Sequence, residues 1–400
     1  MRRGITLFAV AVGLWGTAAA PAPAQTIKVG AAVALTGNFS HEGTQVYRGY
    51  QLWLEEVNKQ GINVGGKRMK VEMVFYDDKS EAQTAVDLTE KLITQDKVQF
   101  ILGPFSSPIT QQTSVIGEKY KILTMAPQAN SDTIYERGFK YVFSVLPPAS
   151  SYFRSFLEMG AKLAPQPKTL AILAGNQPFT LLAAQGTQEH AKRLGYEVVY
   201  NDKYPAPATD LSAFLTQIKA KNPDVVVVAS FFQASVLATK QAKELRLCPK
   251  MMAFSVGPEL PSFSKELGKD SEFVLGSAWW LPTMGWKGPE YGSAKDYAKR
   301  AQDKYGEPAG YHIASGTAAG QLLQMAIEKA GSTETDKVRA ALLGTDVETF
   351  WGPTRWAENG KNVKGGQGII QIQDGKITTV YPDAIREKGL VYPVPCWDKR

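Results

Sequence analysis

Short apolar runs alternate with helix-like segments along most of the chain, and this alternation limits the fold more than any other feature. Strands are predicted at residues 27–33, 70–76 and 98–102. The segments between them carry apolar residues at steps of three and four, which is typical of helices covering a sheet. Because adjacent parallel strands need a long crossover, usually a helix, this order predicts an open, doubly wound parallel sheet.

The same alternation begins again after Pro147 and Pro148. Strands are predicted at 169–173, 197–200 and 224–229, with helices at 185–194, 211–219 and 234–245. The last of these strands holds four consecutive valines, as expected for a strand buried on both faces of a sheet. A chain of 400 residues is also too long for one ordinary core. We therefore predict an α/β fold made of two doubly wound parallel-sheet domains.

The last part of the sequence changes character. A helix is predicted at 311–330, a strand interrupted by Gly-Pro at 350–356, and a β-hairpin at 368–381. Asp374-Gly375 supplies the turn of this hairpin, because this dipeptide accepts the positive φ angles that tight turns require.

Residues 1–24 read as a secretory signal peptide. Two arginines are followed by an apolar run at 5–15, which is too short to span a bilayer, and by an Ala-x-Ala cleavage site at 22–24. The residue directly after the cleavage site is not a cysteine, so a lipid anchor is not expected, and no later segment is long and apolar enough to insert into a membrane. We expect export to a bacterial periplasm.

The charge of the chain argues against a nucleic-acid partner. The sequence has 45 basic and 38 acidic residues, and removal of the two arginines of the signal leaves 43 − 38 = +5. These charges are interspersed and form no dense basic block.

The sequence lacks the common signatures of enzymes, metal sites and nucleotide cofactors. It contains no dinucleotide-binding or phosphate-binding glycine motif, no serine-hydrolase elbow and no zinc-protease motif. Three histidines are too widely spaced to build a metal site, and Asp77-Asp78 is typical of a turn and a helix cap. We therefore expect a non-catalytic binding protein without a cofactor or metal.

The two cysteines, Cys248 and Cys396, leave two possibilities open. Export permits a disulfide, which would tether the C-terminal tail at 387–400 to the end of a helix. The alternative is two separate thiols.

The segment after the strand at 98–102 is the first candidate binding site. Ser106 and Ser107 precede Pro108, a residue suited to the first helical position. In open parallel sheets, ligands lie beyond the carboxyl ends of the strands, where free N–H groups and the helix dipole favour an anion. The motif therefore predicts a carboxylate site, although Ser107 could instead only cap its own helix.

Aromatic residues also gather at or just after strand ends, and we expect about half of them to line a ligand cleft. They are Phe39, Phe105, Phe179, Phe231, Phe232 and either Trp279 or Trp280. Burying one ring removes about 150–250 Å² from water, or roughly 4–6 kcal/mol, against roughly 0.3–1 kcal/mol for the helix dipole. Apolar shape would then supply the affinity and the carboxylate site the orientation.

Taken in order, several segments resemble the periplasmic solute-binding proteins of ABC importers. The likeness is to the branch that binds leucine, isoleucine and valine and to its relatives for amides and aromatic acids. The matching segments are 27–37, 47–49, 55–62, 77–78, 103–110, 126–130, 351–356 and 358–360.

The resemblance implies the type I periplasmic binding fold, a monomeric clamshell whose closed form is recognised by the permease subunits of an importer. Two lobes would be joined by crossovers near 144–148, 278–282 and 352–356. The first lobe would comprise 25–146 plus 283–351, and the second 147–282 plus 352–386.

The resemblance also gives roles to individual residues. Ser107 stands where related proteins hold the solute carboxylate, beside the loop Gln128-Ala129-Asn130, whose last residue is usually serine or threonine. Glu42, Phe179 and Phe231 stand where the amino-acid binders have tyrosines.

Glu259 would match the acidic partner that the family provides for a solute ammonium group, or Ser255 stands at that position instead and indicates a solute without an amine. We expect an aromatic carboxylate of the benzoate or hydroxycinnamate kind, with a branched-chain amino acid as the alternative. A sensory receptor of the same fold is a second class of function, whereas an exported enzyme would need a nucleophile–base pair that the sequence does not suggest.

Overall fold

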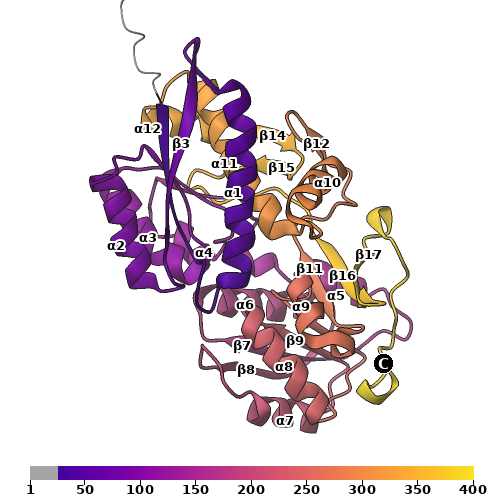
Figure 1. Cartoon of the computed structure of the whole chain (residues 1–400). Helices are drawn as coiled ribbons and strands as arrows, with labels where there is room; N and C mark the ends of the chain where they lie inside the picture. Colours follow the sequence, from indigo (N-terminus) through magenta and orange to yellow (C-terminus); the bar gives the residue numbers. More distant parts are fainter. Residues whose placement is uncertain (1–25) are drawn as a thin grey trace, which may run out of the picture.

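The computed structural model describes residues 26–400, and the predicted signal peptide lies outside the described residues. Figure 1 shows two lobes, each built around one sheet with helices on its faces. This arrangement confirms the predicted α/β fold of two sheets. Within the described part of the chain, no helix combines the length and apolarity needed to cross a membrane.

The first sheet has six strands in the order β2-β3-β1-β4-β5-β6. Its strands are β1 (Thr26–Val33), β2 (Ile62–Val64), β3 (Lys67–Asp77), β4 (Phe100–Leu102), β5 (Thr124–Ala126) and β6 (Val142–Ser144). Its helices are α1 (Ser40–Gln60), α2 (Ala82–Thr94), α3 (Ser107–Tyr120) and α4 (Asp132–Tyr135). All pairings are parallel except β2 with β3, a short antiparallel edge that the sequence patterns did not predict.

The second sheet has seven strands in the order β17-β16-β11-β10-β9-β7-β8. Its strands are β7 (Thr169–Gly175), β8 (Glu197–Tyr204), β9 (Val225–Ala229), β10 (Met251–Phe254), β11 (Leu275–Ala278), β16 (Gly368–Gln373) and β17 (Lys376–Tyr381). Its helices are α5 (Arg154–Gly160), α6 (Pro178–Arg193), α7 (Ser212–Lys221), α8 (Phe232–Glu244) and α9 (Pro261–Leu267). The predicted valine strand is β9, and all five of its residues are buried.

Both sheets share one core topology. The parallel strands run β3-β1-β4-β5-β6 in the first sheet and β8-β7-β9-β10-β11 in the second, so each follows the order 2-1-3-4-5. In this topology the strand order reverses beside the first strand, and ligands bind outside the carboxyl ends at that point. The predicted hairpin at 368–381 is confirmed as β16–β17, which adds an antiparallel edge to the second sheet.

The chain returns to the first lobe after β11. The helices involved are α10 (Ala294–Tyr305), α11 (Tyr311–Ala330) and α12 (Thr335–Leu343). Helix α11 packs closely on α1, where Thr317 donates a hydrogen bond to the carbonyl of Gly49 at 2.8 Å. A Cβ atom on Gly320 would lie 2.2 Å from the indole of Trp53, so only glycine allows this approach. Helix α11 is thereby placed with its first turn at the cleft between the lobes.

We propose a later third crossover than the one that the resemblance implied. Residues 352–356 were expected to cross, but β15 (Gly352–Arg355) folds back on β14 (Asp346–Thr349) as an antiparallel pair. The indole of Trp356 then donates to the carbonyl of Ser144, and the amide of Asn362 donates to that of Val145, both at 2.7 Å. These bonds hold the chain beside the first crossover until about residue 362, before β16 joins the second sheet. We therefore propose lobes of 26–146 plus 283–362 and 147–282 plus 363–386.

A disulfide between Cys248 and Cys396 fixes the C-terminal tail to the second lobe, with a Cα–Cα distance of 5.1 Å. The indole of Trp397 donates a hydrogen bond to the carbonyl of Leu247 at 2.7 Å beside it. The tail thus stabilises one lobe without bridging the cleft.

We predict that Cys396→Ser lowers the free energy of unfolding. The bond closes a loop of 148 positions, and loss of such a cross-link costs about 2–5 kcal/mol. Denaturant unfolding with and without a reducing agent checks this. The reducing agent should bring the parent protein to the stability of the variant and leave the variant unchanged. Equal stability of the two oxidised proteins would contradict the prediction.

Candidate functional site

A small cavity lies between the lobes, at the carboxyl ends of the central strands. About 250 Å³ lies between its lining side chains, including gaps that open to solvent. Its walls are Phe105, Ser107, Gln128, Asn130, Leu146 and Tyr311 from the first lobe, and Tyr152, Phe179, Phe231 and Val256 from the second. The room left for the centre of a water-sized sphere is about 10 Å³, enough for about one water molecule, so a solute requires the side chains or the lobes to move apart.

Four of the predicted aromatic residues gather around the cavity. The ring of Phe231 lies 4.9 Å from that of Phe39, 5.8 Å from that of Phe105 and 5.4 Å from that of Phe179. Phe39 and Phe105 belong to the first lobe, whereas Phe179 and Phe231 belong to the second. The rings therefore meet across the cleft, with Phe231 at the centre.

Phe39 and the remaining predicted aromatic residues do not line the cavity. Phe232 packs 6.5 Å from Phe263 inside the second lobe and stacks on His41 at 4.1 Å. Trp279 lies behind Tyr152, with ring centroids 5.6 Å apart. Trp280 is fully buried, and its indole donates to the carbonyl of Phe350. Position at a strand end did not distinguish the rings that pack in the core from the rings that line the cavity.

The hydroxyl of Ser107 stands at one end of the cavity, in the first turn of α3. Its oxygen accepts a hydrogen bond from the backbone N–H of Ser131 at 3.2 Å, so its own hydrogen is available to donate. Ser107 does not act as the side-chain cap of α3, because the N-cap position belongs to Ser106. The Ser106 hydroxyl is buried and has no partner among the described residues.

The loop after β5 completes this polar end. The amide of Gln128 donates to the hydroxyl of Ser315, and that of Asn130 donates to the carbonyl of Pro147 at 2.7 Å. Ala129 does not line the cavity, and its carbonyl accepts from the hydroxyl of Tyr135. No lysine or arginine is among the lining residues, so the polar end offers neutral donors and acceptors.

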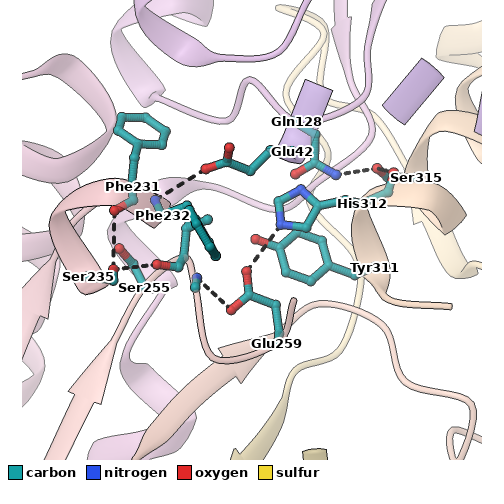
Figure 2. Close-up of polar contacts among 12 residues, drawn as sticks. Glu42, Gln128, Phe231, Phe232, Ser235, Ser255, Glu259, Tyr311, His312 and Ser315 are labelled. Atoms are coloured by element: carbon teal, nitrogen blue, oxygen red, sulfur yellow. Dashed lines mark hydrogen bonds and ion pairs between the residues drawn. The ribbon is translucent and has the colours of Figure 1, made fainter. Parts of the chain in front are cut away.

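Ser255 and Glu259, the two candidates for the position of the acidic partner, are both absent from the cavity wall. The Ser255 hydroxyl donates to the carbonyl of Ser230 and accepts from its N–H, which uses its only hydrogen. One oxygen of Glu259 accepts from the N–H of Gly257, and the other lies 3.1 Å from Nε2 of His312 (Figure 2). Burial raises the pKa of Glu259 to about 8 and lowers the pKa of His312 to about 3, so both are uncharged at neutral pH.

Glu42 occupies a different position from the one expected. It extends from α1 toward the second lobe, where its carboxyl group accepts a hydrogen bond from the N–H of Phe232 at 3.2 Å (Figure 2). It is not among the residues lining the cavity.

Sequence reasoning missed two tyrosines on the cavity wall. The hydroxyls of Tyr152 and Tyr311 lie 3.0 Å apart across the cleft, and that of Tyr152 also donates to the carbonyl of Ser255 at 2.6 Å. The position of Tyr152, just after the first crossover, could have indicated its role. Tyr311 begins a helix that follows no strand end, so its place depends on the packing of α11 on α1.

Comparison with known proteins supports one family. A family model described as periplasmic binding protein matches residues 26–376. Leu/Ile/Val-binding protein homolog 7 from Brucella abortus is 26% identical over 398 residues, which cover 94% of this chain and 96% of the relative.

Two solved structures share the fold. The leucine-binding protein LivK from Thermotoga maritima has a TM-score of 0.80 and 22% identity, over 89% of this chain and 98% of its own. A solute-binding protein from R. palustris in complex with benzoate has a TM-score of 0.75 and 19% identity, over 90% of this chain and 99% of its own.

We predict that Glu259→Gln changes the pH dependence of stability. The pKa of the carboxyl group is raised from 4.5 to about 8 on folding, so its contribution is complete below pH 4.5 and is lost as pH rises through about 8. The variant lacks this titration. Its free energy of unfolding relative to the parent protein should therefore rise with pH, by at most about 1.4 kcal/mol per unit.

Denaturant unfolding at pH 5, 6.5 and 8 checks this, with the exposed Glu334→Gln as the matched control. Parallel pH curves for the parent protein and Glu259→Gln would contradict the buried, protonated state of Glu259.

Proposed function

This chain belongs to the periplasmic binding protein family, and we propose that it captures a small aromatic carboxylate and delivers it to an ABC import permease. The family is periplasmic, and its members bind solutes and are not enzymes, which confirms the non-catalytic prediction. Solutes of the benzoate or hydroxycinnamate kind suit the proposed site.

The observation that supports this ligand class is a neutral, ring-lined cavity with hydrogen-bonding groups at one end. Burial of a solute ring between Phe105, Phe179 and Phe231 would contribute roughly 4–6 kcal/mol. The Ser107 hydroxyl and the first turn of α3 would hold the carboxylate. The helix dipole adds up to about 2 kcal/mol when partly buried, so it orients the solute more than it drives affinity.

The same cavity is unfavourable for a free ammonium group. None of its lining residues is acidic, and a buried charge without a partner is very costly. Glu259 already uses both oxygens, toward Gly257 and His312. A solute that has a carboxylate and no amine therefore fits the arrangement best.

A branched-chain amino acid is the second candidate. Glu259 supports it, because release of its carboxyl group from His312 would provide an ammonium partner near the cleft. LivK, the leucine-binding protein with the same fold, is consistent with this alternative. A sensory role would leave the site unchanged and differ only in the partner that recognises the closed form.

A thermal-shift panel of benzoate, 4-hydroxybenzoate, cinnamate and 4-hydroxycinnamate, with leucine and isoleucine beside them, tests the ligand class. A ligand at 100 times its Kd stabilises the folded state by about 2.7 kcal/mol, which is a clear shift in Tm. We expect one or more aromatic acids to raise Tm and the amino acids to have no effect. A shift with leucine and none with the aromatic acids would overturn the proposal in favour of the second candidate.

We predict that Ser107→Ala weakens binding of the aromatic acid that gives the largest shift. Loss of a hydrogen bond to a charged group costs about 1.5–3 kcal/mol, or roughly 10–150-fold in Kd. Isothermal titration calorimetry measures the change.

Ser293→Ala is the matched control, because Ser293 is a true side-chain cap, of α10, and does not line the cavity. It should lower stability and leave Kd unchanged. If Ser107→Ala behaves in the same way, Ser107 has only a structural role.

A further inference from the structure

One cross-cleft hydrogen bond in the closed structure is made by a carboxyl group that has no cationic partner. Glu42 lies in the first turn of α1, in the first lobe, and accepts from the N–H of Phe232, the first residue of α8 in the second lobe, at 3.2 Å. Figure 2 shows its side chain directed toward this helix end. Glu42 has the position of a cap for α8, although it comes from the other lobe.

This carboxyl group is fully enclosed. Glu42 has 0% of its surface exposed, and its second oxygen has no hydrogen-bond partner among the described residues. A buried, ionised carboxylate is stable only with a charged partner or a full set of hydrogen bonds. Glu42 has neither, and burial raises its pKa to about 8.

The groups that face Glu42 offer no compensating charge. Glu259, from the loop after β10, raises the pKa of Glu42 further. The pKa of Tyr311 on α11 is raised by burial and also by the nearby Glu259 and Glu42. His312 on α11 is neutral, because burial lowers its pKa to about 3. On its own helix, His41 stacks on Phe232 at 4.1 Å. No lysine or arginine forms a bond with Glu42 in the part of the chain that the structure describes.

Separation of the lobes would break this bond and expose the group. Among the described residues, the hydrogen bonds of the Glu42 side chain go to its own backbone N–H and to Phe232, and Phe232 is the partner in the opposite lobe. In an open form the carboxyl group would face water and ionise as an ordinary glutamate. The two forms therefore differ by one proton over most of the neutral range.

We propose that Glu42 is a positioning residue that holds the lobes closed over the solute, and that it takes up one proton from solvent each time they close. The inference rests on the proposed function, in which closure captures the solute. The protonated carboxyl group keeps its carbonyl oxygen as the acceptor for the N–H of Phe232. Closure thus needs no cation, and an anionic solute is trapped together with a proton.

The direction of the pH effect follows from the two forms. The pKa of Glu42 rises from 4.5, its ordinary value, to about 8 on closure. Closure is then independent of pH below about 4.5 and becomes less favourable by up to tenfold per pH unit as pH rises through about 8. Glu259 approaches His312 of the opposite lobe and adds a similar dependence, so the test must isolate Glu42 by comparison with a variant.

Small-angle X-ray scattering of the solute-free protein at pH 6 and pH 8.5 provides the test, on the parent protein, Glu42→Gln and Glu42→Ala. Glutamine keeps an acceptor for Phe232 and does not titrate, whereas alanine removes the acceptor. We expect the parent protein to become more compact at pH 6. We expect Glu42→Gln to be more compact than the parent protein at pH 8.5, with a smaller pH effect, and Glu42→Ala to remain more open at both values.

Calorimetry with benzoate adds a second measurement. The slope of log Kd against pH between 6 and 8 should be smaller by up to one unit in Glu42→Gln, whereas Glu334→Gln, an exposed acid, should match the parent protein. If benzoate does not bind, the proposed ligand class is in doubt and scattering still decides the role of Glu42. An equal pH response in the parent protein and Glu42→Gln, or no pH-dependent compaction of the parent protein, would overturn the proposal.

Discussion

The structure depends on one constraint, the direction of parallel strands. Because all parallel strands of a sheet end at the same edge, two such sheets that face each other bring the ends of β4, β5, β7, β9 and β10 to one cleft. Each strand end is followed by a loop or a helix N-terminus, which places exposed N–H groups and short polar side chains there. Ser107 and Asn130 reach the cavity from one lobe for this reason, and Phe179 and Phe231 reach it from the other.

The contacts across the cleft are mainly aromatic and uncharged. Rings from both lobes meet at Phe231, and the hydroxyls of Tyr152 and Tyr311 meet beside them. The acids in this region, Glu42 and Glu259, are kept protonated by burial, and His312 is kept neutral. Because these contacts are uncharged, the lobes can separate without breaking strong ion pairs. Such a balance suits a receptor that must release what it binds.

The sequence predicted the fold well because the signals of parallel sheets are local. The four valines of β9, the turn Asp374-Gly375 and the apolar steps on α1 each depend on neighbouring residues alone. The proposed shift of the third crossover rests on the hydrogen bonds of Trp356 and Asn362, which join this segment to residues about 200 positions away and leave no local signal. Phe232 and Trp279 were assigned to the site because strand-end position does not show which way a ring points.

By itself, the sequence determined the two α/β domains, because periodicity is local, and the resemblance of several segments indicated the solute-binding family. Tertiary structure decided which rings line the cavity, and it brought Tyr311 to the wall through the packing of α11 on α1. Glu42 and Glu259, which were expected beside a ligand, instead contact Phe232 and His312 of the opposite lobe. The physical reason is that orientation and burial arise from contacts between distant segments, and burial is the largest cause of the raised pKa values of these acids.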